Sequence, residues 1–170
     1  WSKVLREEIT FWKFVQYLFD KQWRQLKRYA NERGVAIIGD MPFYVSMDSS
    51  DAWANHRLFE LDARHLPKRV AGVPPDYFSP TGQLWGNPLY DWAAMKEEGY
   101  AWWIARVQKS LALYDQVRID HFRALASYWA VDAKADTAMD GGWEQGPGMD
   151  FFNALHRACP RPAIIAEDLG

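Results

Sequence analysis

The sequence predicts an α/β fold built on a parallel β-sheet. Three short apolar runs, each closed by acidic residues, alternate with helical patterns along the chain. They are 35–40 ("VAIIGD"), 117–120 ("VRID") and 163–168 ("AIIAED"). Strands that alternate with helices typically form a parallel sheet with right-handed crossovers. Functional groups gather at the carboxyl ends of such strands, so we expect Asp40, Asp120 and Glu167 to share one edge of the sheet.

The first expected element is a long amphipathic helix over residues 6–33. Apolar side chains recur there at helical spacing, with basic and polar residues between them. Gly34 follows at the position where a helix C-cap belongs. Many of the apolar residues are aromatic, for example Phe14 and Trp23. Such a stripe is more often core than ligand site, so we expect it to be buried.

Two further helices are expected between the strands. The first covers about 91–114, with Asp91 as its N-cap, and Gly99 should break or kink it. The second covers about 149–158 and ends before Pro160. These helices complete the alternation that the parallel sheet requires.

The spacing of the acids predicts a large insertion after the first strand. A (β/α)₈ barrel has about 250 residues and therefore spends about 31 on each repeat. Eighty residues separate Asp40 from Asp120, and 47 separate Asp120 from Glu167. We therefore expect residues 41–90 to form an elaborate loop region over the mouth of the sheet, within one domain that spans 1–170.

Composition argues against several functional classes. The chain of 170 residues carries 20 Lys and Arg against 22 Asp and Glu, a formal net charge of −2, which gives no electrostatic reason to expect nucleic acid or an anionic membrane as a partner. No apolar run approaches the roughly 18 residues of a membrane span. Neither a G-x-G-x-x-G fingerprint nor a P-loop occurs, and the four histidines lack zinc-site spacing, so no cofactor or metal is predicted.

The remaining global features concern location and completeness. The single cysteine, Cys159, excludes an intramolecular disulfide, and with no signal-peptide pattern it favours a cytoplasmic location. The sequence starts at Trp1 rather than Met and stops at Gly170 directly after a strand-like run. We therefore expect an internal segment of a longer protein.

Asp120 and Glu167 are the candidate catalytic pair. Cleavage of a glycosidic bond with retention needs two carboxyl groups about 5–5.5 Å apart, one as nucleophile and one as acid/base. Arg118, His121 and Arg123 flank Asp120, and nearby cations favour an ionised nucleophile. The alternative is that both acids are only helix caps or ion-pair residues.

The loop at 71–92 is the second candidate feature, because it combines prolines and glycines with five aromatic residues. Rigid aromatic rings suit the apolar face of a sugar, whose hydroxyls need polar partners. The aromatic candidates are Tyr77, Phe78 and Trp85, and the polar ones are Asp76, Gln83 and Asn87. A structural Ω-loop packed by its own side chains is the alternative.

The segment 39–53 offers weaker candidates. Asp40 can accept hydrogen bonds from substrate hydroxyls, and Tyr44 can stack on a sugar ring. Asp48 and Asp51 suggest a cation site, but their spacing completes no known loop. We expect Asp51 instead to be the N-cap of a following helix.

Five blocks in this order closely resemble one family. They are "GDMPFYV" (39–45), "DSSDAWAN" (48–55), "GVPPDYFSPTGQLWGNPLYDW" (72–92), "VRIDHFR" (117–123) and "IIAEDLG" (164–170). The resemblance, from about residue 11 to the end, is to the 4-alpha-glucanotransferases (amylomaltases or disproportionating enzymes) of glycoside hydrolase family 77 in the alpha-amylase clan. It implies a (β/α)₈ barrel of which this chain supplies about strands three to five.

The resemblance also implies roles for individual residues. Asp120 falls on the nucleophile and Glu167 on the general acid/base. Arg118 and His121 fall on partners of the nucleophile and the donor glucose, and Asp40 on a substrate-contacting acid. The residues that fall in the loop covering the acceptor side of the cleft are Tyr77, Phe78 and Trp85. The implied partners are 1,4-alpha-glucans (maltodextrin, starch or glycogen) and glucose, with no organic cofactor.

Two departures from the family pattern qualify these expectations. Ala124 stands where the family usually has Gly. The family's third carboxylate, in a His-Asp pair, would lie beyond Gly170, and the first two strands would lie before Trp1. The alternatives are therefore a non-catalytic alpha-glucan-binding segment, or a retaining alpha-glucan hydrolase that shares the first half-reaction.

Overall fold

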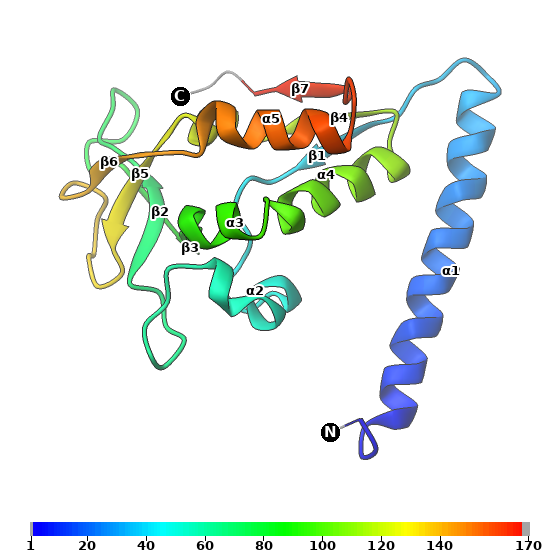
Figure 1. The fold of residues 1–170 in the computed structure, drawn as a ribbon, viewed down its shortest axis with the longest axis horizontal. Coiled ribbons are helices and arrows are strands. Elements are labelled where there is room, and N and C mark those ends of the chain that lie inside the picture. Colours follow the sequence, from blue (N-terminus) through cyan, green and yellow to red (C-terminus); the bar gives the residue numbers. More distant parts are fainter. Residues whose placement is uncertain (1, 168–170) are drawn as a thin grey trace.

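The computed structural model describes residues 2–167, which form a mixed α/β structure with two sheets (Figure 1). The first sheet has three parallel strands in the order β1 (Ile38–Met41), β4 (Gln116–Ile119) and β7 (Ile164–Ala166). All three predicted strands are confirmed, each with bounds shifted by a few residues. Asp40 lies directly opposite Arg118 in the register of β1 and β4.

The predicted helices between these strands are also present. The segment 91–114 is divided into α3 (Trp92–Glu97) and α4 (Ala101–Leu113). The break is at Gly99, whose φ of +64° lies in the left-handed region that favours glycine. Asp91 caps α3, since its carboxylate accepts a hydrogen bond from the Ala94 amide. The helix α5 (Gly148–Ala158) precedes β7.

The second sheet was not predicted. It has four antiparallel strands in the order β3 (Gln83–Pro88), β2 (Arg69–Val73), β5 (Ser127–Asp132) and β6 (Gly142–Gln145). Much of the range expected to be loop, 41–90, is therefore regular structure. That range also contains α2 (Ser50–Ala54) and the 3₁₀ helix η1 (His56–Leu58).

The prediction that Asp51 is the N-cap of the helix that follows it is wrong by two residues. Ser49 is the N-cap of α2, because its hydroxyl accepts the hydrogen bond from the Ala52 amide at 3.1 Å. Asp51 lies inside the first turn, and its carboxylate accepts a hydrogen bond from Trp102 in α4. Asp51 therefore ties α2 to α4 rather than starting the helix.

Aromatic rings are the bulkiest members of the core between the first sheet and α3–α5. Its largest fully buried side chains are Trp103, Tyr90, Phe43 and Phe151. Their rings pack edge-on or tilted, with Phe43 and Trp103 centroids 5.1 Å apart. The packing is close at β1 as well, since a Cβ on Gly39 would lie 2.1 Å from the Tyr114 ring. Aromatic rings thus provide the largest side chains of the core, although others, such as Trp53 and Tyr77, are exposed.

The helix α1 (Arg6–Asn31) is present as predicted, but its expected burial is wrong for the residues that the structure describes. None of its residues is buried, and Phe14 and Phe19 are about half exposed. Figure 1 shows α1 standing apart from the body of the chain. Its C-terminal half is attached to the body of the chain, for example by the Trp23 indole, which donates a 2.8 Å hydrogen bond to the Leu113 carbonyl. Periodicity predicts an apolar face but not what covers it.

Within residues 2–167, no helix has the combination of length and apolar character that a membrane crossing needs.

Candidate active site

The parallel register brings the charged residues of β1 and β4 together. Arg118 is bonded to two acids, with Nη1 donating to Asp40 at 2.6 Å and Nη2 to Asp120 at 3.0 Å. The hydrogen bond to Asp40, followed by the negative charges of both carboxylates, raises the pKa of Arg118 above its ordinary value. The charged Arg118 guanidinium therefore orients Asp120, which lies two residues further along the chain.

Glu167 lies at the same edge, immediately after β7. Its Oε2 accepts a hydrogen bond of 3.1 Å from the backbone N–H of His121, and its own N–H donates to the Ile119 carbonyl at 3.2 Å. Glu167 is thus held against the backbone on either side of Asp120. The neighbouring acid expected to influence Glu167, Asp168, lies outside the described residues.

His121 is a buried, uncharged member of the site rather than a cation. Burial lowers its pKa, although the charges of Asp120 and Glu167 act in the opposite direction and Arg123 lowers it further. Its Nε2 is buried and has no hydrogen-bond partner within residues 2–167. The backbone at His121 has a φ of +48°, a left-handed conformation that costs roughly 1–2 kcal/mol for most residues.

Of the three expected cations around Asp120, only Arg118 contacts it. The Arg123 guanidinium lies over the Trp143 ring, 4.0 Å from its centroid. The expectation that three positive charges hold Asp120 is therefore wrong for His121, because of burial, and for Arg123, because of its orientation.

Asp120 and His121 open onto a cavity of about 210 Å³. The other walls come from the segment after β1, Pro42 to Tyr44, and from Trp85 and Asn87 of β3. Both Trp85 and Asn87 line the cavity, and Gly86 between them has a φ of +78° at an irregularity in the pairing of β2 with β3. The Trp85 ring meets the His121 imidazole edge-on, with centroids 4.8 Å apart. Apolar rings beside a carboxylate and an imidazole suit a sugar.

Arg106 of α4 supports this cavity, and sequence reasoning missed it. Its guanidinium donates hydrogen bonds to the carbonyls of Pro42 and Phe43, the latter at 2.9 Å. The Tyr90 hydroxyl donates to the same Phe43 carbonyl at 2.6 Å. More than sixty residues separate Arg106 from these carbonyls, so no local pattern could have revealed the contact.

The tip of the β2–β3 hairpin contributes nothing to the cavity wall. The side chains of Tyr77 and Phe78 are almost fully exposed, and the two rings contact each other edge-on at 5.8 Å. The Asp76 carboxylate accepts hydrogen bonds from the Phe78 and Ser79 amides, which shapes the turn. Gln83 likewise bonds locally, to the Trp85 indole at 3.1 Å. The structure thus places Asp76, Tyr77 and Phe78 outside the cavity wall at Asp120, whereas Gln83 contacts that wall through Trp85.

Two site residues have a second, structural role. The Asn87 side-chain amide donates to the Val45 carbonyl at 3.0 Å, which ties β3 to the segment after β1. Tyr44 is buried, and its pKa is raised, mainly by that burial. Among the described residues, no group of three or more His, Cys, Asp or Glu side chains converges as a metal ion would need.

Comparison with known proteins identifies the family of the chain. The model of glycoside hydrolase family 77, described as 4-alpha-glucanotransferase, matches residues 1–170. The 4-alpha-glucanotransferase of Streptococcus pneumoniae is 51% identical over 170 residues, which is 100% of this chain and 34% of that protein. The 4-alpha-glucanotransferase of Clostridium butyricum is 50% identical over 167 residues, 98% of this chain and 34% of that protein.

A solved structure extends the likeness to three dimensions. The amylomaltase from Streptococcus agalactiae, in complex with acarbose, superposes with a TM-score of 0.96 at 46% identity, over 99% of this chain and 34% of that one. The chain thus spans about a third of the length of the relatives it matches. With a family match along its whole length, this chain belongs to glycoside hydrolase family 77, the 4-alpha-glucanotransferases.

Proposed function

We propose that the protein transfers a segment of a 1,4-alpha-glucan to the 4-hydroxyl of glucose or of another 1,4-alpha-glucan. The observation that carries this proposal is the placement of Asp120 and Glu167. Both follow neighbouring parallel strands, and the backbone N–H of His121, the residue after Asp120, donates to the Glu167 carboxylate. A retaining mechanism requires two carboxyl groups at one site, and this placement offers Asp120 and Glu167 as that pair.

In the first step, an Asp120 oxygen attacks C1 of a bound glucan. The bond from C1 to the leaving 4-oxygen breaks, and Glu167 gives its proton to that oxygen. The products of this step are a glucosyl ester on Asp120 and a released glucan end. Arg118 orients Asp120 for the attack through its 3.0 Å hydrogen bond.

In the second step, the 4-hydroxyl of an acceptor gives its proton to Glu167 and attacks C1. The ester bond breaks, and Asp120 leaves as a carboxylate. One glycosidic bond is lost and one is formed, so no oxidant or cofactor takes part. The partly exposed Trp85 offers apolar surface to the acceptor, which favours it over water, while the buried Tyr44 supports the wall behind it.

The surrounding residues have supporting roles in this scheme. The neutral His121 imidazole and the Asp40 carboxylate form hydrogen bonds with sugar hydroxyls. Tyr77 and Phe78 are solvent-exposed at the hairpin tip, where they cover an acceptor glucan, with Asp76 shaping their turn. We assign β1, β4 and β7 to strands three to five of a (β/α)₈ barrel, whose other strands supply the third carboxylate. The expected location is the cytoplasm.

The test is the action of the full-length protein on maltotriose. We expect glucose together with maltopentaose and longer maltodextrins, with a constant number of reducing ends, because each transfer breaks one bond and forms another. A steady rise in reducing ends with only glucose and maltose as products would indicate a hydrolase instead. No change in maltotriose would contradict catalysis altogether.

A further inference from the structure

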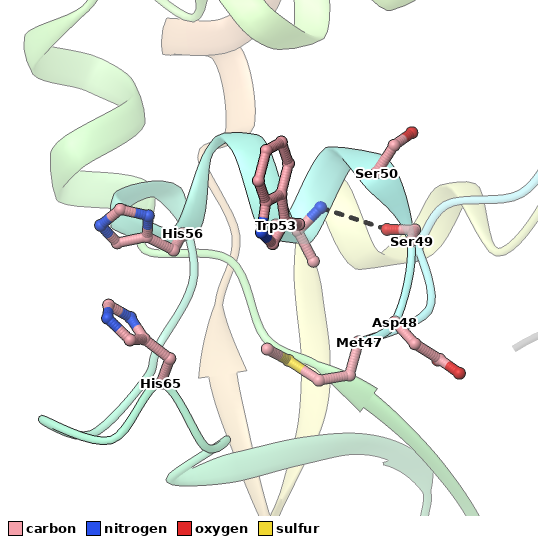
Figure 2. Close-up of a pocket in the computed structure, with 8 residues that line it drawn as sticks. Met47, Asp48, Ser49, Ser50, Trp53, His56 and His65 are labelled. Atoms are coloured by element: carbon pink, nitrogen blue, oxygen red, sulfur yellow. Dashed lines mark hydrogen bonds between the residues drawn. The ribbon is translucent and has the colours of Figure 1, made fainter. Parts of the chain in front are cut away.

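The larger of the two hollows near the segment after β1 lies beside α2, away from Asp120. Its volume is about 720 Å³, within the range of about 300–1,000 Å³ that is usual for small-molecule sites. Its walls come from the segment 47–56 and from the turn that carries His65 (Figure 2). The mechanism proposed above uses none of these residues.

Trp53 is the main aromatic surface of this hollow. Its side chain is 83% exposed, although its neighbour Ala52 is fully buried. The helix beneath it is held by the Ser49 cap and by the hydrogen bond from the Trp102 indole to Asp51. A rigid helix therefore presents a large ring to solvent. One exposed aromatic residue is not unusual, so a ligand must be argued from what surrounds it.

Two histidines from different elements meet at one end of the hollow. The rings of His56 and His65 are 4.6 Å apart and nearly perpendicular, and Figure 2 shows one above the other, with Met47 and Trp53 beside them. His65 has a φ of +60°, a strained conformation for a residue other than glycine. The turn is held by Asp62, whose carboxylate accepts hydrogen bonds from the amides of Arg64 and Leu66.

Polar groups and apolar surface thus alternate around the hollow. Figure 2 shows Asp48 at the opposite end from the imidazole pair. A hydrogen bond of 2.6 Å from the Ser46 hydroxyl lowers the pKa of Asp48, so this carboxylate is an acceptor at neutral pH. A flat ring flanked by donors and acceptors matches a glucose unit, which has an apolar face and a rim of hydroxyls.

We propose that this hollow is an accessory α-glucan subsite in which Trp53 stacks on a glucose unit and His56, His65 and Asp48 bond its hydroxyls. The proposal rests on the function proposed above, since it takes the same class of ligand. One stretch of chain links the two places, because residues 42–44 line the cavity at Asp120 and residues 47–53 line this hollow. A glucan long enough to reach both gains affinity from two linked contacts.

The test compares two glucans on the full-length protein carrying Asp120→Asn, which prevents turnover during the measurement. Calorimetric titration gives the Kd of maltoheptaose and of maltotriose. We expect Trp53→Ala to weaken maltoheptaose binding about tenfold, which corresponds to about 1.4 kcal/mol, while lowering maltotriose affinity much less. The ratio of the two Kd values is the readout, since general damage to the fold would weaken both glucans.

Two further variants sharpen the test. Trp53→Tyr retains a ring, and we expect it to keep most of the preference for maltoheptaose. His65→Asn accepts the left-handed backbone but lacks the imidazole, and we expect it to lose part of that preference. An unchanged Kd ratio in Trp53→Ala would overturn the subsite, as would an equal loss in Trp53→Tyr and Trp53→Ala.

The outcomes also separate this subsite from the proposed reaction. If the wild-type protein leaves maltotriose unchanged but maltoheptaose binding still depends on Trp53, the subsite stands and the proposed reaction fails. If transfer occurs and the Kd ratio does not depend on Trp53, the reaction stands and the subsite is overturned.

Discussion

The two sheets of this chain contribute different chemistry to one cavity. The parallel sheet supplies charge, since Asp120 directly follows β4 and lines the cavity, and Arg118 within β4 bonds both Asp120 and Asp40 of β1. The antiparallel sheet supplies surface, since Trp85 and Asn87 project from within β3. The end of a parallel strand therefore carries the candidate nucleophile, and an antiparallel strand carries part of the wall that shapes the site.

The largest expected effect lies at the parallel sheet. Asp120→Asn should lower transfer by about 10⁴-fold or more, because the amide is a poor nucleophile for C1 and the step has no substitute. The measurement is maltotriose disproportionation by the full-length protein. Asp136→Asn, at an exposed acid between β5 and β6, is the matched control and should remain active. Substantial turnover by Asp120→Asn would refute the nucleophile.

A smaller effect, on stability rather than chemistry, is expected at the antiparallel sheet. Arg69 of β2 bonds Glu60 through two nitrogens and Glu144 of β6 through a third. All three side chains are partly exposed to solvent, so we expect Arg69→Met to lower the free energy of unfolding by only about 1 kcal/mol. Denaturant titration measures this, and activity per folded molecule should stay close to wild type.

The control for Arg69 is Arg64→Met. Arg64 is 80% exposed and lies 3.7 Å from Asp62, so its loss should leave stability unchanged within error. A large fall in the activity of folded Arg69→Met would show that the antiparallel sheet does more than shape the site.

The smallest expected effect is a pH dependence at His121, which follows the parallel sheet and leads into the antiparallel one. Burial lowers its pKa from the ordinary 6.5, so below that pH the unfolded chain binds more protons than the folded one. Stability should therefore fall as pH drops below about 6.5 and level off once pH is below the lowered pKa. His121→Asn should flatten this slope, since Asn also tolerates the left-handed backbone.

Denaturant titrations between pH 5 and 8 give this slope. The exposed His156, changed to Asn, controls for the loss of one imidazole. A wild-type slope retained in His121→Asn would contradict the assignment of this pH dependence to His121.

The same contrast explains what could be predicted from the sequence. The parallel strands are short continuous apolar runs, and their order along the chain places the acids at one edge. The antiparallel strands β2 ("RVAGV") and β3 ("QLWGNP") contain glycine and proline, which indicate turns, and β2 pairs with β5, about 60 residues away. Such pairing depends on the fold as a whole, so local patterns did not reveal it.

The candidate site residues also divide into those that local sequence could predict and those that depend on the whole fold. Those at strand ends could be predicted because the strand itself fixes their position. The charge state of His121, the orientation of Arg123 and the support from Arg106 could not, since they depend on burial and on contacts between distant segments.

The pair of hydrogen bonds from Arg118 to Asp40 and Asp120 has a consequence for folding. Val117 and Ile119 are buried on one face of β4, so Arg118 between them must point to the other. A slip of β1 against β4 by a single residue would move Asp40 out of line with Arg118 and separate the ion pair. The strand register that fills the core is thus the same one that joins Asp40 to Arg118, so a chain that misaligns these strands loses this ion pair together with its hydrophobic packing.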